Sequence, residues 1–186
     1  MSRFTQLFEP LPGAWLLQRE VLGDSRGTLS RLFCAEELSV LGWEPRIAQV
    51  NLTSTSRCGT IRGLHFQFPP HSEKKLVTCI RGRVWDVIVD IRAGSPTFLM
   101  WHAEELTDEN HRSLLIPEGF AHGFQTLSDE VEMLYCHSAA YVQTAEGGLY
   151  PLDSTLQISW PLPITELSAR DHQHPALNDS FQGIVI

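Results

Sequence analysis

The chain has 186 residues, of which 42% are hydrophobic and 19% charged, and its formal net charge is −8. These values are typical of one ordinary globular domain with a sizeable core. The negative charge argues against a nucleic-acid partner, whose phosphates it would repel, although two or three clustered cations could still hold a small anionic ligand.

The N-terminal residues 1–6 lack the basic end and apolar stretch of a signal peptide. Apolar runs are everywhere too short to span a bilayer, so we expect no membrane association. Four scattered cysteines, without a C-x-x-C pair, are typical of reduced thiols and not of a disulfide framework or a zinc site. We therefore expect a single cytoplasmic domain that comprises residues 1–186.

Short apolar runs, separated by glycine, proline and aspartate, dominate the chain. Many such runs predict an all-β sandwich or barrel. The best helical segment is short, at residues 34–41, with Gly42 placed to end it. The proline-rich residues 161–186 are predicted to form an arm that wraps the barrel with little regular structure. The predicted strands are residues 47–52, 60–66, 77–80, 84–91, 98–103, 113–116, 123–127 and 132–136.

Residues 77–80 and 84–91 are predicted to pair as a hairpin around a glycine-centred loop at residues 81–83. Side chains alternate along the second strand, with Val84 and Ile88 on one face and Val87 and Val89 on the other. Because both faces are largely apolar, we expect this strand to be covered on both sides.

The segment Ile116–Phe124 contains the motif P-x-G-x-x-H, which resembles the second signature of the cupin barrel and directs His122 inward. The first cupin signature supplies H-x-H and a glutamate, but here Gln67 stands where the second histidine would be. Two imidazoles without a suitably spaced carboxylate fall short of the three protein ligands of a catalytic metal. We therefore expect a cupin (double-stranded β-helix, jelly-roll) barrel with short flanking helices, without a metal and without a cofactor.

Further motifs extend the resemblance to roughly residues 15–177. The chain carries G-D-S-R-G at 23–27, Q-V-N at 49–51, R-G-L-H-F-Q at 62–67, K-L-V at 75–77, D-V-I-V-D-I-R at 86–92, S-P-T-F at 95–98, L-Y at 134–135, W-P at 160–161 and L-S-A-R-D at 167–171. Together with the segment at 116–124, these motifs resemble the dTDP-4-dehydrorhamnose 3,5-epimerase family.

The resemblance implies an isomerase that inverts C3, C5 or both of a 4-keto-6-deoxyhexose carried on a nucleotide diphosphate. A hydrogen beside a ketone is acidic because its removal leaves an enolate, so inversion needs a base, an acid on the opposite face and a partner for the enolate oxygen. The family pattern assigns these tasks to His65 as base, Tyr135 as proton donor and Lys75 as enolate partner. Asp171 would orient the imidazole.

Binding roles also follow from the resemblance. Arg26 and Arg62 would grip the diphosphate with their forked donors. Gln49, Asn51 and His122 would line the substrate site, with His122 ordering Asp86 or the neighbouring backbone.

The strand that carries His65 presents a geometric difficulty. On a straight strand Gly63, His65 and Gln67 face one side while Arg62 faces the other. Both Arg62 and His65 can serve one site if the strand bends, and Gly63 is the place for such a bend. Alternatively, Arg62 reaches the ligand from the rim of the barrel.

The chain departs from the family pattern where the family recognises its nucleotide base. The departures are T-L-S-R at 28–31, A-A-Y at 139–141 and P-L-D at 151–153. A substrate on another nucleotide, such as CDP, and epimerisation at C5 alone therefore stay open alternatives.

Two other functions also stay open at this stage. A metal-dependent cupin oxygenase or isomerase would use His65 and His122, and a sugar-binding cupin would have no activity. The family resemblance further implies a homodimer, with N-terminal strands near residues 15–17 and 28–33 at the interface, where an exposed edge would otherwise remain. Arg26 would then serve the partner's site.

Overall fold

A computed structural model of the chain describes residues 2–44, 46–178 and 180–186. Most of the regular structure belongs to two sheets. The first sheet contains β1 (Phe4–Phe8), β2 (Trp15–Arg19), β10 (Arg112–Ile116), β7 (Lys75–Arg81), β12 (Val131–His137) and β5 (Gln49–Thr55), in that order. The second sheet contains β13 (Glu146–Gly148), β6 (Thr60–Gln67), β11 (Phe120–Thr126), β8 (Arg83–Asp90) and β9 (Trp101–Thr107), and β14 (Glu166–Leu167) adds to β6 in parallel.

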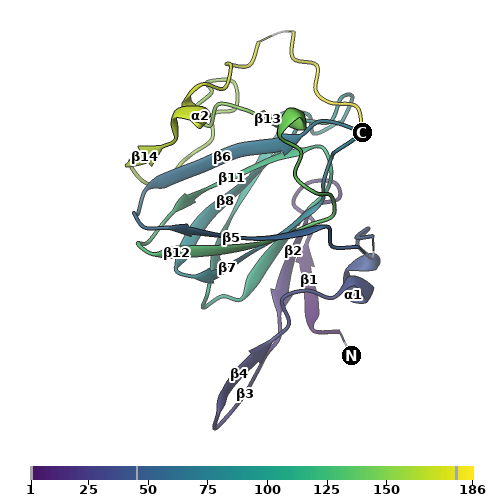
Figure 1. Cartoon of the computed structure of the whole chain (residues 1–186), viewed down its shortest axis with the longest axis vertical. Coiled ribbons are helices and arrows are strands. Elements are labelled where there is room, and N and C mark those ends of the chain that lie inside the picture. The colour runs from purple at the N-terminus through teal and green to yellow at the C-terminus, as the bar shows by residue number, and fades with distance from the viewer. Residues whose placement is uncertain (1, 45, 179) are drawn as a thin grey trace.

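The two sheets lie face to face, with β6, β11 and β8 in one layer and β5, β12 and β7 in the other (Figure 1). Along the chain, successive strands alternate between the layers from β5 to β8 and again from β9 to β12. This is the winding of a jelly-roll barrel. The prediction of an all-β cupin-type fold is confirmed.

The predicted hairpin at residues 77–91 is wrong, although both of its strands exist. β7 pairs with β10 and β12, whereas β8 pairs with β9 and β11. The chain turns at Gly82, with φ at 77°, and crosses from the first sheet to the second. A tight glycine turn therefore indicates a change of direction here without specifying the partner strand.

The main core lies between the sheets, and a second core covers the outer face of the second sheet. Val84 and Ile88 of β8 belong to the first core. Val87 and Val89, on the opposite face of β8, pack with Ile184 and the C-terminal residues around it. The two-sided burial of this strand is confirmed, and so is the wrapping arm: in its described residues, regular structure is limited to β14, the short helix α2 (Ala169–His172) and one β-bridge at Ile184.

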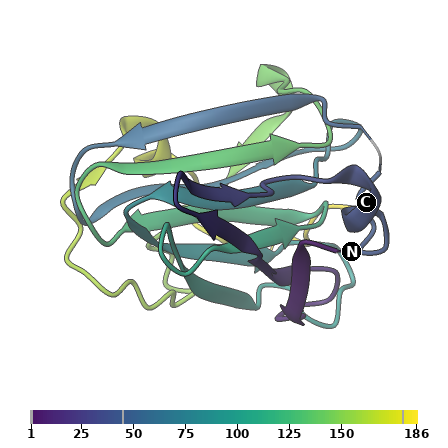
Figure 2. The ribbon, with the colours of Figure 1, turned by 90° about the horizontal axis from the view of Figure 1, so that it is seen from below.

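The N-terminal strands are arranged differently from the expectation. β2 is an interior strand, because β1 and β10 pair with its two edges, so the edge expected at residues 15–17 lies at β1 instead. β3 (Val21–Asp24) and β4 (Gly27–Ser30) form a separate hairpin that projects from the barrel and lies nearest the viewer in Figure 2. Helix α1 (Ala35–Ser39) is shorter than the predicted segment, and Gly42, with φ at 85°, follows it.

All four cysteines are free thiols, and Cys79 and Cys136 are buried. Across the described ranges, the helices are too short and polar to cross a bilayer.

Strand β6 bends at Gly63, so Arg62 and His65 can share one site. This was one of the two possibilities that the sequence left open. His122 of β11 pairs with His65 and Phe124 pairs with Arg62, so two steps along β11 match three along β6. The extra residue is a β-bulge, which redirects the side chains beyond it. Gly63 has φ at 130°, and a Cβ atom on it would lie 2.5 Å from the Cα of Gly123.

We predict that Gly63→Ala destabilises the fold far more than Gly94→Ala. Both glycines have positive φ, but a Cβ at Gly94 meets nothing within 4 Å. The control therefore isolates the conformational cost, about 1 kcal/mol, from the clash, which adds roughly 1–3 kcal/mol. Urea denaturation measures both variants, and equal losses of unfolding free energy would show that the contact with Gly123 is unimportant.

Candidate active site

A cavity of about 330 Å³ opens between the two sheets, and its lining comes from both of them. Seven of the predicted site residues line it, namely Gln49, Asn51, Arg62, His65, Lys75, His122 and Tyr135. Asp171 is buried directly behind His65. Arg26 lies elsewhere, at the tip of the β3–β4 hairpin, where it pairs with Asp24 and its side chain is 87% exposed.

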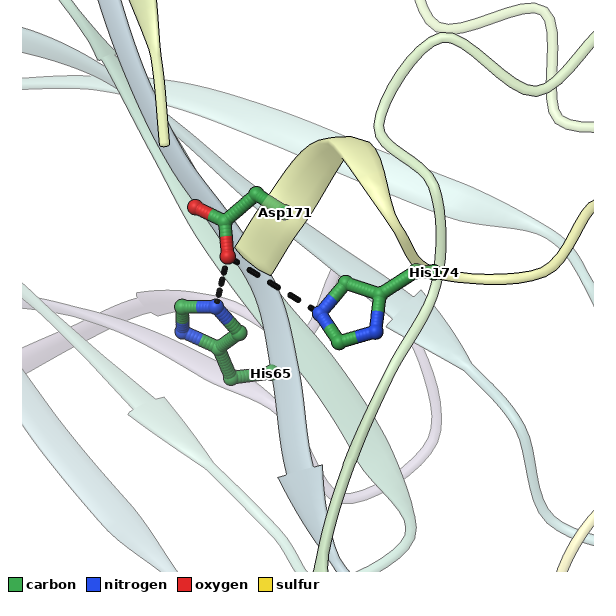
Figure 3. Close-up of side chains that lie close together, drawn as sticks. All are labelled: His65, Asp171 and His174. Atoms are coloured by element: carbon green, nitrogen blue, oxygen red, sulfur yellow. Dashed lines mark hydrogen bonds and ion pairs between the residues drawn. The ribbon is translucent and has the colours of Figure 1, made fainter. Parts of the chain in front are cut away.

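The C-terminal arm brings Asp171 to β6. β14 runs parallel to β6 with Leu167 opposite Ile61, and the Ser168 hydroxyl then accepts the backbone N–H of Asp171 to start α2. The carboxylate of Asp171 lies 2.7 Å from Nε2 of His65 (Figure 3). Its other oxygen accepts the N–H of Gly63 at 3.3 Å. An ionised carboxylate only accepts hydrogen bonds, so the contact with Asp171 corresponds to the tautomer with the proton on Nε2 and the lone pair on Nδ1.

The environment of Asp171 stabilises its ionised form. Burial alone acts to raise the pKa of Asp171, but the hydrogen bond and charge of His65 and the N–H of Gly63 lower it by more, to about 2. The carboxylate is therefore negative at neutral pH and favours positive charge on the His65 ring. An imidazole becomes positively charged when it takes a proton as a base, and the carboxylate of Asp171 stabilises that positive charge.

His174, which none of the sequence motifs includes, belongs to the same cluster. Its Nε2 is buried without a hydrogen bond, 3.8 Å from the Asp171 carboxylate, and its ring meets the His65 ring edge-on at 6.0 Å (Figure 3). The ligand atoms of His65, Asp171 and His174 lie within 4.8 Å of one another, the one such metal-type group in the described chain. The cationic Arg170 side chain, 3.0 Å from Nε2 of His65, disfavours a metal cation there.

Tyr135 approaches the cavity from the opposite sheet. It lies on β12, whereas His65 lies on β6, so the two side chains line one cavity from opposing layers. Burial raises the pKa of Tyr135 above the usual phenol value, and the charge of Asp86 raises it further against the opposing effects of Thr53 and Arg62. The phenol thus keeps its proton at neutral pH and can act as a donor.

Lys75 is buried at the start of β7, where Nζ contacts the backbone oxygen of His65 at 3.3 Å and the carboxylate of Glu73 at 3.1 Å. The side chain of Glu73 is only 9% exposed. Burial acts to raise the pKa of Glu73, but His137 and Lys75 lower it by more.

His122 and Arg62 both line the cavity. Nε2 of His122 lies 2.9 Å from the buried carboxylate of Asp86, the partner expected for it. Arg62 lines the cavity beside His65 because of the bulge at Gly63, so the bend, and not reach from the rim, brings them together.

Several residues of the cavity were missed by the sequence reasoning. They are Gln67, Glu73, His137, Tyr141, Glu146 and Arg170, with His174 behind them. Gln67 stands inside the motif R-G-L-H-F-Q and Glu73 lies two residues before Lys75, so their closeness to His65 and Lys75 was a usable signal. His137 ends β12, Tyr141 and Glu146 follow that strand, and Arg170 and His174 belong to the arm. No spacing rule connects these residues to β6.

The geometry of this cavity indicates the class of protein. A cupin-type barrel with a carboxylate–histidine pair on one wall, a protonated phenol on the other and a lysine between them suits an isomerase that moves protons on carbon.

Comparisons with known proteins specify the family. Residues 9–179 match the family model of dTDP-4-dehydrorhamnose 3,5-epimerase. The chain therefore belongs to the dTDP-4-dehydrorhamnose 3,5-epimerase family. Membership favours an epimerase over the metal-dependent oxygenase and the inactive sugar-binding protein that the sequence left open.

Individual relatives agree with this assignment. A dTDP-4-dehydrorhamnose 3,5-epimerase from Streptomyces griseus is 44% identical over 167 residues, which cover 89% of this chain and 82% of that protein. A dTDP-4-dehydrorhamnose 3-epimerase from Streptomyces niveus is 39% identical, over 87% of this chain and 78% of that protein. The crystal structure of a 3,5-epimerase from Legionella pneumophila Philadelphia 1, in complex with dTDP-4-keto-L-rhamnose, superposes with a TM-score of 0.90 at 34% identity and covers 98% of both chains.

We predict that Asp171 makes folding stability depend on acid pH. Its pKa is about 2 in the folded chain and about 3.9 in an unfolded one, so its contribution is complete above pH 4 and is lost as the pH falls towards 2. The loss is about 2 kcal/mol. Urea denaturation between pH 5 and pH 2.5 should show a shallower pH dependence for Asp171→Asn than for wild type. The exposed Glu109→Gln serves as the control and should keep the wild-type slope.

Proposed function

We propose that this protein epimerises C3, C5 or both of a dTDP-linked 4-keto-6-deoxyhexose by proton transfer beside the ketone. The observation that carries the proposal is the cavity itself, in which His65 with its Asp171 partner and Tyr135 lie on opposing sheets. Inversion of a carbon centre requires a proton to leave from one face and return to the other, and two groups on opposite walls satisfy that requirement.

In the proposed reaction Nδ1 of His65 removes the proton beside the C4 ketone, and the electron pair of that C–H bond forms the enolate. Asp171 stabilises the imidazolium produced. The ammonium of Lys75 stabilises the negative charge on the enolate oxygen, a contribution typically worth several kcal/mol in a buried site. Tyr135 donates its proton to the opposite face of the carbon. The imidazolium of His65 then releases its proton to solvent, and solvent returns a proton to the phenolate of Tyr135.

Arg62 is the proposed contact to the diphosphate, supported by its place in the cavity and by the bidentate geometry that guanidinium offers to phosphate oxygens. Gln49 and Asn51 line the same mouth and would bind polar groups of the substrate. The thymine nucleotide is proposed because the relatives described above are named for dTDP sugars. We also propose a cytoplasmic location, which the four free thiols support.

We propose that the protein is a homodimer in which Arg26 reaches the partner's cavity. The projecting β3–β4 hairpin carries exposed apolar side chains, with Leu29 70% exposed. The edge strand β5 beside the cavity is likewise exposed, at Val50 and Leu52. An edge strand with apolar side chains is a template for a second chain, and pairing would remove both exposed surfaces.

We predict that the wild-type protein exchanges hydrogen at C3 or C5 of dTDP-4-keto-6-deoxyglucose in deuterated water, followed by NMR. His65→Asn should lower exchange at least about 100-fold because it removes the base. Tyr135→Phe should retain exchange but lose inversion, since the proton can then return only from the His65 face. His172→Asn, on an exposed histidine of α2, is the control. Absence of exchange by the wild type with this substrate and its CDP analogue would refute the proposal.

The dimer proposal predicts complementation between two inactive variants. In a mixture of Arg26→Ala and His65→Asn, dissociated and reassociated together, a mixed dimer contains one cavity with an intact His65 and the partner's intact Arg26. Activity should therefore appear that neither variant shows alone. A mixture that stays as inactive as its parents, with mixed dimers present by native mass spectrometry, would place the action of Arg26 within its own chain.

A further inference from the structure

The proposed reaction leaves one buried charged group of the cavity without a task. Glu73 lies in the loop before β7, and its carboxylate faces three donors. Oε1 is 3.1 Å from Nζ of Lys75, while Oε2 is 2.9 Å from Nδ1 of His137 and 3.2 Å from the side-chain amide of Gln67. Burial of a carboxylate reduces the stability of the fold little when all its donors are in place, whereas burial of an unpaired carboxylate is strongly destabilising.

The donors of Glu73 are themselves fixed by other contacts. The oxygen of the Gln67 amide accepts the N–H of Val142, and its nitrogen also donates to the backbone oxygen of His71. His137 donates through Nδ1, which leaves Nε2 as the acceptor for the Asn51 amide at 3.4 Å. Glu73 is therefore held by strands β6 and β12 as well as by its own loop, so the position of its carboxylate is determined by both sheets.

This arrangement decides where the Lys75 ammonium points. An ammonium group has three N–H donors. One faces Glu73 and a second faces the backbone oxygen of His65, so a third is left for the cavity that Lys75 lines. Lys75 is unbranched and flexible, and without the two contacts its buried end would have several rotamers to choose from.

We propose that Glu73, held by His137 and Gln67, is a positioning residue that aims the third N–H of Lys75 at the substrate oxygen. The inference rests on the proposed function, because it assigns Lys75 to the enolate oxygen. Glu73 acts through Lys75 and does not itself transfer a proton, since both of its oxygens are occupied by donors.

Glu73 is the carboxylate that pairs with Lys75. The other acidic side chains at the cavity are engaged elsewhere: Asp171 contacts His65, Asp86 contacts His122, and Glu146 of β13 pairs with Arg170. Without Glu73, the buried ammonium of Lys75 would lose its carboxylate partner while sharing the cavity with the cation of Arg62.

The first test is Glu73→Gln, which keeps the size of the side chain and removes its charge. We expect the turnover rate for hydrogen exchange to fall on the order of 10-fold to 100-fold. The Michaelis constant should change little, because Glu73 acts through Lys75 and not on the bound nucleotide. Binding of thymidine diphosphate, measured by calorimetry, should be unchanged and reports that the variant is folded. Glu105→Gln, which removes the carboxylate of an exposed ion pair on β9, should match wild type.

A double-mutant cycle with Lys75→Met separates action through Lys75 from a general structural effect. In the Lys75→Met background, Glu73→Gln should change the exchange rate less than about twofold, because the group that Glu73 positions is gone. Equal losses in both backgrounds, or a rise in the Michaelis constant with an unchanged turnover rate, would overturn the inference.

Variants of His137 also test the positioning role of Glu73, and they do so even if Glu73→Gln does not fold. His137→Asn can place an amide N–H near the position of Nδ1 and should stay close to wild type, whereas His137→Phe should behave like Glu73→Gln. A wild-type turnover rate in His137→Phe would contradict the inference. Failure of the proposed function has a different signature, because the wild type itself would then show no exchange.

Discussion

The close approach of β6 to β11 at Gly63 and Gly123 is the constraint on which the site depends. A Cβ atom on Gly123 would lie 2.7 Å from the backbone oxygen of Arg62, and one on Gly63 would meet Gly123. With both positions free of side chains, β6 can hold an extra residue against β11, and Arg62 and His65 then line the same cavity. Asp171 contacts the same bend, since one oxygen accepts the N–H of Gly63 and the other binds His65.

The cavity contains several ionisable groups, and they are arranged in pairs. His65 has Asp171, His122 has Asp86 and Lys75 has Glu73, each within 3.1 Å. Pairing lowers the cost of burial for each charge and also fixes the orientation of the member that faces the cavity. In every pair the carboxylate lies behind or beside a nitrogen group that is turned to the substrate side, so acid–base properties and geometry are set by the same contacts.

The sequence predicted single strands well and their pairing less well. Alternation and turn residues were sufficient to locate β5 to β12 approximately and to predict that β8 is buried on both faces. They gave the wrong partner for β7, because a glycine turn at Gly82 fits a hairpin and a crossover between sheets equally well. The choice depends on which surfaces are buried together, and that is a property of the whole barrel.

The short motifs in the sequence determined much of the candidate site. R-G-L-H-F-Q and the P-x-G-x-x-H segment placed His65 and His122 on strands, and the glycine at 63 indicated the bend that brings Arg62 beside His65. Family resemblance added Asp171, Tyr135 and Lys75, which local patterns alone would leave as ordinary helix, core and turn residues.

Only the tertiary structure decided how these residues are held. Glu73 is adjacent to Lys75 in sequence, but its burial depends on His137 and Gln67, which come from two other strands. His174 reaches His65 because the arm runs along β6, and Arg26 is kept away because its hairpin leaves the barrel. Spacing along a chain fixes the direction of neighbouring side chains, whereas burial and partner choice arise from contacts between segments far apart in sequence, and these exist only once both sheets have closed on each other.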